Sequence, residues 1–239
     1  MKIAVKEKLK SLKNLPKEKK LDILVAVSLG IATFLVAWAG WIGSLHGGNQ
    51  ATNYTRSNNL ASEGNAEYNV AAQVYITDLF TWNTIFNLRL DLEAAQAMGD
   101  TVEVKIIEAK IDKLEHEIYT PELLKAINNN ASKNDTSSPF ENPEFISSYF
   151  ADAKKLLDES QQAMEEGKID NQRGDSYQLA SVIYSLVLFL LGIIGVQKDF
   201  QSRKTLYIFA VCILIFGFIY MLTLPLPTGF DITSFFSTK

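Results

Sequence analysis

The stretch LVAWAGWIGSLHGGNQATNYTRSNNLASEG, residues 35–64, decides the fold of this chain. It passes from an apolar segment to a polar one through His46, Gly47 and Gly48. If a helix ends at the two glycines, the chain is a membrane anchor that carries a separate domain. If the helix continues, the membrane and solvent parts form one structure.

A stripe of small residues indicates that the helix continues. Within the apolar segment, small residues recur in alternating steps of four and three, at Ala26, Gly30, Thr33, Ala37, Gly40 and Ser44. This 3.5-residue period places them on one face of a helix with a left-handed partner, and small residues let membrane helices approach closely. The same count passes the glycines without meeting a charge, and helix formers run to Met98 before the stop signal Gly99-Asp100.

Three apolar segments predict three transmembrane helices. Residues 23–45 carry no charge and are enough to cross a hydrocarbon core of ~30 Å. We assign spans to 22–45, 178–197 and 205–224, a basic arm to 1–21, an acidic segment to 46–177, a link to 198–204 and a tail to 225–239. The apolar runs 23–45, 177–197 and 205–224 contain no Asp, Glu, Lys, Arg or His, which argues against a pump or an ion-coupled carrier.

The distribution of charge predicts the orientation. Basic residues precede the first span and fill the short link, whereas segment 46–177 holds 11 basic and 22 acidic residues, a net charge of −11. By the positive-inside rule the N-terminus is cytoplasmic, and residues 46–177 and the C-terminus lie outside the cell membrane. The arm is either an amphipathic helix on the cytoplasmic membrane surface or a simple basic flank. Its eight lysines are Lys2, Lys6, Lys8, Lys10, Lys13, Lys17, Lys19 and Lys20.

A second stripe returns to the membrane. A helix opening at Pro143 enters the second span through Ser181, Ser185, Gly192 and Gly195, and none of its charged residues falls on the stripe. The two stripes predict an outer seam made of Tyr68, Tyr75, Leu79, Trp82, Phe86, Ile146, Phe150, Leu157 and Met164. The pattern leaves open whether the stripes pair within one chain or between chains.

Between the two long helices, Asp100 and Glu103 form a predicted capping box that starts a helix with one apolar face. Thr120-Pro121 is predicted to cap one or two further helical turns that end at Ile127. Residues 128–143 are predicted to form a polar loop, with possible glycan acceptors at Asn130 and Asn134. The predicted fold is therefore an all-α membrane protein with three transmembrane helices. A long helical or coiled-coil extracytoplasmic stalk or bundle continues from the first two.

The sequence offers little chemistry. It has no phosphate-binding loop, nucleophile elbow or paired-cysteine site, so we expect no catalytic residue and no cofactor. His116 and Asp112 share a helix face and could hold a metal, but a solvated acidic face is the better interpretation, and no metal site is predicted. The lone Cys212 excludes an intrachain disulfide.

The layout of one anchor, a long helical segment and a closing two-span hairpin resembles a family of uncharacterised prokaryotic three-span membrane proteins, a domain of unknown function. The stretch GDSYQLASVIYSLVLFLLGI (174–193) is most similar to it, and the polybasic arm is a departure. The resemblance implies the layout and no activity.

From the stripes we expect a non-enzymatic membrane scaffold or accessory subunit. Its partners would be the lipid bilayer and a second copy or a partner membrane complex, and not nucleic acid. The alternative is an oligomeric channel gated by its outer helical domain, with a pore lined by Ser28, Thr33, Ser181 and Ser185.

Overall fold

The protein is helical throughout the part of the chain that the structure describes. The computed structural model describes residues 16–132 and 137–230, and all regular elements within these ranges are helices. Three of them are long and apolar enough to cross a membrane. The chain is therefore an all-α membrane protein, as predicted.

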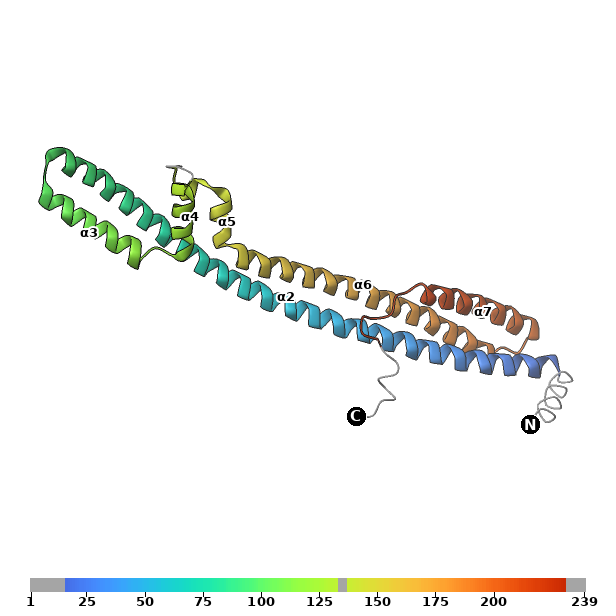
Figure 1. The fold of residues 1–239 in the computed structure, drawn as a ribbon. Helices are drawn as coiled ribbons and strands as arrows, with labels where there is room; N and C mark the ends of the chain where they lie inside the picture. Colours follow the sequence, from blue (N-terminus) through green and yellow to red (C-terminus); the bar gives the residue numbers. More distant parts are fainter. Residues whose placement is uncertain (1–15, 133–136, 231–239) are drawn as a thin grey trace, which may run out of the picture. The chain divides into compact units, whose positions relative to one another are not determined.

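Helix α2 answers the question raised by residues 35–64. It runs without a break from Lys17 to Met98, through Gly47 and Gly48 (Figure 1). It ends where Gly99 adopts a φ of 75°, a left-handed conformation that glycine reaches without steric cost. The prediction that the helix continues past the glycines and stops at Gly99 is confirmed.

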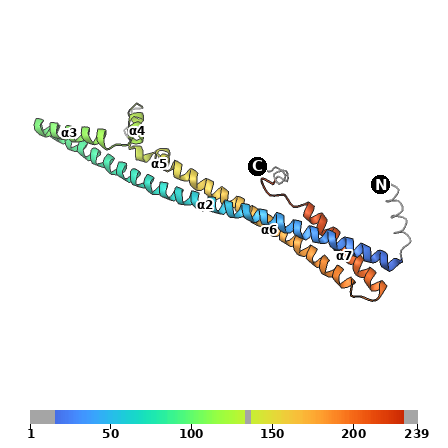
Figure 2. The same cartoon turned by 90° about the horizontal axis from the view of Figure 1, so that it is seen from below.

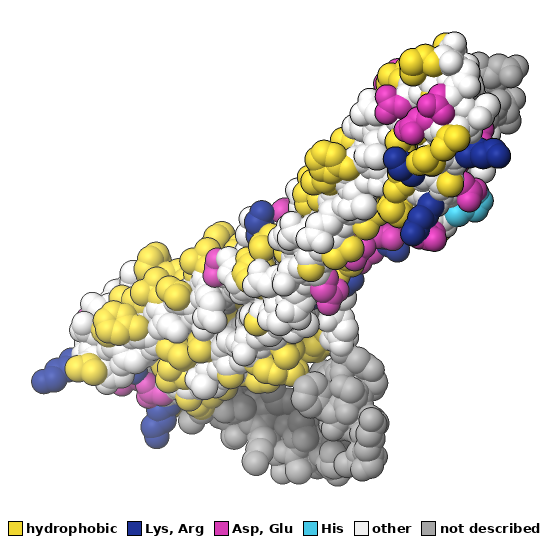
Figure 3. Space-filling model, turned by 90° about the vertical axis from the view of Figure 1, so that its left-hand side faces the viewer, with side chains coloured by type: hydrophobic (Ala, Val, Ile, Leu, Met, Phe, Trp, Pro, Cys, Tyr) yellow, Lys and Arg dark blue, Asp and Glu magenta, His cyan; other side chains and the backbone are white. Residues whose placement is uncertain are grey.

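The chain divides into two compact units, and each of the helices α2 and α6 (Ala151–Ile194) contributes to both. Unit 1 consists of residues 1–55 and 163–239, and unit 2 consists of residues 56–162. The space-filling view shows surface regions rich in hydrophobic side chains and others where charged side chains gather (Figure 3).

Unit 1 is a bundle of α2, α6 and α7 (Phe200–Leu222), which lie side by side in Figures 1 and 2. Helix α7 begins earlier than the third predicted span, because the Asp199 side chain caps it by accepting a hydrogen bond from the backbone N–H of Ser202 at 2.8 Å. It packs against α6 at Gly217, where an added Cβ would lie 3.0 Å from side-chain atoms of Ile183 and Tyr184. Only a third or less of each apolar window is buried inside the protein, which leaves most of its surface for lipid.

The buried stripe of α2 has the predicted 3.5-residue period, but it lies one residue before the predicted one. Val25, Ala32, Ala39 and His46 are buried and recur every seven residues. The matching positions of α6 are Tyr177, Ala180, Tyr184, Val187, Leu191 and Ile194. This register buries large apolar side chains such as Leu35 and Ile42, which gain more from burial than glycine does.

Unit 2 packs α3 (Thr101–Glu117), α4 (Pro121–Ser132), the short 3-10 helix η1 (Pro139–Glu141) and α5 (Pro143–Tyr149) against α2. The Asp100 half of the predicted capping box is confirmed, because the Asp100 side chain accepts hydrogen bonds from the backbone N–H groups of Val102 and Glu103. The backbone N–H of Asp100 donates to the carbonyl oxygen of Ala95 and not to the Glu103 side chain, so the box is not reciprocal. Helix α4 runs beyond the predicted Ile127, so the polar loop is shorter than expected. The core of unit 2 contains Ile85, Tyr119 and Leu123.

The return helix differs from its prediction, because it is interrupted at Phe150. Residues 143–149 form α5, and α6 begins only at Ala151. The hydroxyls of Ser147 and Ser148 donate to the carbonyls of Glu144 and Phe145, which offers these carbonyls an alternative to continuous helix. The ring of Phe150 then packs against that of Tyr68, with centroids 4.9 Å apart.

Close approach of α2 and α6 in unit 1 depends on Gly167. An added Cβ there would lie 2.5 Å from ring atoms of Tyr54, whereas one at Gly48 would meet nothing within 4 Å. We expect Gly48→Ala to stabilise the protein by up to about 1 kcal/mol through helix propensity. Gly167→Ala should instead lower the melting temperature, because overpacking costs about 1–3 kcal/mol.

Thermal unfolding of both variants in one detergent, followed by helical circular dichroism, checks this expectation. Both glycines lie inside helices of unit 1, so the change in helix propensity is matched. Equal shifts in melting temperature would show that the contact with Tyr54 is unimportant.

Candidate functional site

A buried histidine marks the end of the apolar part of unit 1. His46 is fully buried, and its ring lies 5.8 Å from that of Tyr177, centroid to centroid. Its Nδ1 is 2.9 Å from Oδ1 of Asp170 on α6, and its Nε2 is 3.2 Å from the carbonyl oxygen of Pro225. One side chain of α2 thus holds α6 and the segment after α7 together.

The hydrogen bonds of His46 determine where its protons are. A carbonyl oxygen can only accept, so Nε2 carries a proton and donates it to Pro225. The contact between Nδ1 and Asp170 needs one further proton, which belongs either to the imidazole or to the carboxyl. In both arrangements the net charge of the His46–Asp170 pair is zero.

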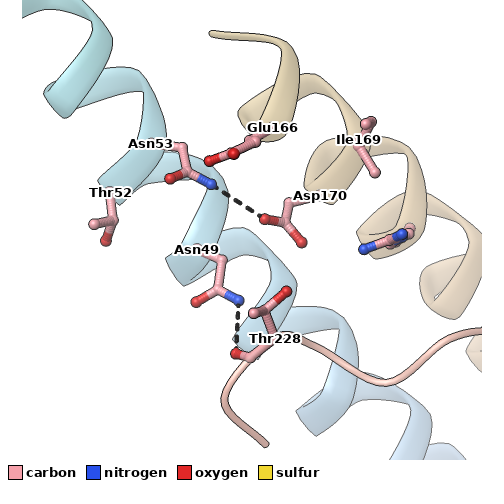
Figure 4. Close-up of a pocket in the computed structure, with 8 residues that line it drawn as sticks. Asn49, Thr52, Asn53, Glu166, Ile169, Asp170 and Thr228 are labelled. Atoms are coloured by element: carbon pink, nitrogen blue, oxygen red, sulfur yellow. Dashed lines mark hydrogen bonds between the residues drawn. The ribbon is translucent and has the colours of Figure 1, made fainter. Parts of the chain in front are cut away.

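A pocket of about 480 Å³ lies beside this pair in unit 1. Figure 4 shows that Asn49, Thr52 and Asn53 of α2 line it on one side, and Glu166, Ile169 and Asp170 of α6 line it on the other. The remaining lining residues are Arg173 and Thr228.

Amide side chains of α2 fix the walls of the pocket. Asn53 donates from Nδ2 to Oδ2 of Asp170 at 3.4 Å, and Asn49 donates from Nδ2 to the carbonyl oxygen of Thr228 at 3.3 Å (Figure 4). With the bond from His46 to Pro225, the segment after α7 is held to α2 at two points. The pocket is therefore built from three parts of the chain that hydrogen bonds keep in place.

An aromatic group lies on the apolar side of the pocket. The ring of Phe230 meets those of Trp38 and Trp41 edge to face, with centroids 6.3 and 5.7 Å apart. Tryptophan is enriched where membranes meet water. The sequence of the tail predicts that Phe230, Ile232, Phe235 and Phe236 lie near the outer interface. Phe230 makes the contacts given above, and the other three lie outside the described residues.

A second buried polar site lies in unit 2, around Asp78. This fully buried carboxylate accepts hydrogen bonds from the hydroxyl of Tyr149 at 2.7 Å and from the hydroxyl and backbone N–H of Thr120 at 2.5 and 3.4 Å. The hydroxyl of Thr120 also accepts from the backbone N–H of Leu123 and caps α4. Asp78 thereby connects α2 to α4 and α5.

Two tyrosines near Asp78 remain protonated. Burial raises the pKa of Tyr149 above its ordinary value of 10.0, and the hydrogen bond to Asp78 raises it further. Burial likewise raises the pKa of Tyr119, and the charge of Glu115 adds to the rise. Around neutral pH, Tyr149 is therefore a permanent donor to Asp78.

The structure places the predicted membrane packing residues away from the contacts between helices of the same chain. A Cβ added at Gly30, Gly40 or Gly192 would meet nothing within 4 Å, and one at Gly195 would meet only the carbonyl oxygen of Gly192, at 3.4 Å. Ala26, Thr33, Ala37, Ser44 and Ser185 are exposed, and Ser181 is half-buried. The glycines in close contact with other helices are instead Gly43, Gly64, Gly167, Gly174 and Gly217.

The predicted outer seam is brought together in part. Tyr75 lies against Phe150, with ring centroids 6.2 Å apart, and Leu157 packs beside Gly64. Tyr68 contacts Phe150, and Trp82 packs on the core of unit 2. Leu79, Ile146 and Met164 are half-buried, while the side chain of Phe86 is exposed.

The other predicted surface residues lie in varied settings. Lys17, Lys19 and Lys20 begin α2, whereas Lys6, Lys8, Lys10 and Lys13 and the possible glycan acceptor Asn134 lie outside the described residues. The other acceptor, Asn130, is half-buried in α4 and donates to the carbonyl oxygen of Ser137 at 3.2 Å.

The sequence did not predict that His46, Asp78 and Asp170 are buried, because the buried face of each helix was expected to carry no charged residue. A charged residue at a core position has no periodic signature that separates it from a surface charge. The sign that could have indicated His46 is its place at the end of an uncharged run, where a polar side chain needs a partner.

Comparisons with known proteins found no match: no protein-family model, no curated protein and no solved structure is similar to the chain. The resemblance to a three-span family of unknown function stays a prediction.

Proposed function

We propose that the protein is a non-enzymatic membrane scaffold or accessory subunit that assembles with a second chain through the small-residue face of α2. Its N-terminus would be cytoplasmic, with residues 46–177 and the C-terminus on the outer side of the cell membrane. The exposed lysines that begin α2 and the ion pair between Arg203 and Asp22 at the same end of the bundle support this orientation.

The observation that carries the proposal is the open surface at Gly30 and Gly40. The bundle of unit 1 is built on the neighbouring stripe of α2, and Ala26, Thr33 and Ala37 also remain exposed. A smooth face of this kind lets the backbone of another helix approach closely, and van der Waals packing stabilises such contacts in lipid. Large exposed residues, such as Val27 and Phe34, border this face and are suited to contact with acyl chains.

The hydrogen bonds of His46 support a role without catalysis. Both ring nitrogens form hydrogen bonds inside unit 1, so the ring offers no free nitrogen to a substrate. The channel alternative gains less support, because Ser28, one of its expected pore residues, is bonded to the hydroxyl of Tyr207 inside the bundle. Recording in a planar bilayer tests it, since a scaffold conducts nothing.

Gly40→Leu is expected to abolish or strongly weaken assembly while the single chain keeps its stability. A Cβ at this position meets nothing of the same chain within 4 Å, and the larger leucine side chain blocks close approach by another helix. Cross-linking in native membranes and native mass spectrometry after gentle extraction measure the oligomer or complex.

Val27→Leu is the matched control, because it enlarges an apolar side chain on the lipid-facing side of the same helix. Gly40→Ala should give an intermediate effect. If Gly40→Leu assembles like the unmodified protein, or if the unmodified protein is a monomer in its own membrane, this face is not an interface and the proposal fails.

A further inference from the structure

The pocket beside His46 lies at the level where the apolar segments end. Leu45 and Leu224 belong to the apolar cluster with Trp38 and Trp41, and the hydrogen bonds that shape the pocket begin one residue later on each segment, at His46 and Pro225. A pocket at this level of a membrane protein faces the headgroups of the bilayer.

The charged residues of the pocket follow an order along α6. Arg173 is closest to the apolar end of the helix, Asp170 lies one turn away, and Glu166 lies a further turn away. The rise between Arg173 and Glu166 is about 10 Å, at 1.5 Å per residue.

The pocket has one positive and one negative group, which lie at different levels along α6. Since the His46–Asp170 pair has no net charge, the remaining charges are the guanidinium of Arg173 and the carboxylate of Glu166. Arg173 forms no ion pair with any residue that the structure describes. A ligand that complements this pocket carries a negative group near the apolar side and a positive group farther out.

We propose that this pocket binds the headgroup of a phospholipid that combines a phosphodiester with a primary ammonium, as in phosphatidylethanolamine. With acyl chains in the membrane, the phosphate of such a lipid lies closest to the apolar segments and the ammonium lies outermost, which is the order of Arg173 and Glu166. The guanidinium can bind phosphate oxygens in a bidentate manner. The ammonium donates to Glu166, with Oδ2 of Asp170 and the amide oxygens of Asn49 and Asn53 as further acceptors.

This recognition does not rest on the proposed assembly, because every residue involved belongs to unit 1 of a single chain. The same zwitterion also exists as a soluble molecule, glycerophosphoethanolamine, which has the phosphodiester and the ammonium without acyl chains. The experiment therefore includes both forms.

The test uses the full-length protein in nanodiscs of phosphatidylcholine that contain equal small amounts of phosphatidylethanolamine and phosphatidylglycerol. Native mass spectrometry after release counts the lipids that stay bound. We expect phosphatidylethanolamine to be retained in preference to phosphatidylglycerol and phosphatidylcholine. Arg173→Gln should weaken its retention about tenfold or more, because it removes a charge-assisted hydrogen bond to the phosphate. Lys168→Gln is the matched control, because it removes an equal charge from an exposed residue of the same helix that pairs with Glu165.

A second pair of variants tests the ammonium. Glu166→Gln should reduce the preference for phosphatidylethanolamine over phosphatidylcholine, whose quaternary ammonium cannot donate a hydrogen bond, and the neighbouring Glu165→Gln should not. Calorimetric titration with glycerophosphoethanolamine distinguishes the sources: weak binding supports the lipid, and binding of equal strength that needs Arg173 supports the same chemistry from a soluble ligand. Equal retention of the three lipids, or full retention by Arg173→Gln in a protein with unchanged circular dichroism, would overturn the proposal.

Discussion

Asp78→Ala is expected to destabilise unit 2 by about 3–5 kcal/mol. The change removes a fully buried carboxylate and leaves the hydroxyls of Tyr149 and Thr120 without their acceptor. Hydrogen bonds to a charged group contribute about 1.5–3 kcal/mol each, and a small cavity adds to the loss. Hydrogen exchange of the full-length protein in detergent should show faster exchange in α4 and α5 than in the unmodified protein.

Two further variants make this prediction specific. Asp91→Ala removes a carboxylate from an exposed position of the same helix, so exchange in α4 and α5 should not change. Tyr149→Phe removes one of the donors and leaves Thr120 in place, so its effect should be smaller than that of Asp78→Ala. Unchanged protection of α4 and α5 in Asp78→Ala would show that the carboxylate does not hold these helices.

His46→Ala is expected to cost about 3–5 kcal/mol in unit 1, because it leaves the carboxyl of Asp170 buried with only the 3.4 Å bond from Asn53. It also removes the donor to Pro225 that holds the segment after α7. Replacing both partners with apolar residues, His46→Met with Asp170→Leu, should cost less than His46→Ala, because no buried charge then lacks a partner. Denaturant unfolding in mixed micelles measures these free energies.

The second histidine of the chain supplies the control. His116 and Asp112 form an ion pair four residues apart on α3, with Nδ1 and Oδ1 3.3 Å apart, but both side chains are about three-quarters exposed. A double-mutant cycle on this pair should give a coupling energy close to zero, because solvent screens exposed ion pairs. A cycle on His46 and Asp170 that also gives zero would contradict the role of the buried pair.

The helices could be predicted because their signals are local. An uncharged run long enough to cross a bilayer needs no tertiary partner to be recognised. The cap of α3 depends on Asp100 and the next three residues, and the end of α2 depends on the conformational freedom of Gly99. Even the continuity of α2 through Gly47 and Gly48 could be inferred from a period that keeps its phase on both sides.

The register of packing could not be read in the same way. A 3.5-residue period describes several parallel stripes of one helix, and the charge-free stripe of small residues is only one of them. The structure buries the neighbouring stripe, in which Val25, Ala32 and Ala39 contact the bundle, and leaves Gly30 and Gly40 open. Which stripe of α2 is buried depends on the shape of the surface that α6 and α7 present to it, and that surface exists only in the folded bundle.

What the sequence alone determined is the all-α class, the three apolar helices and the unbroken run of α2, because each follows from composition and spacing along one segment. What only the tertiary structure decided is the pairing of buried polar groups: His46 with Asp170, and Asp78 with Thr120 and Tyr149. These partners are far apart in the chain, and a charge is stable in the interior only when a donor or an opposite charge is brought to it. The pocket beside His46 depends on the same long-range contacts, so no local pattern could predict it.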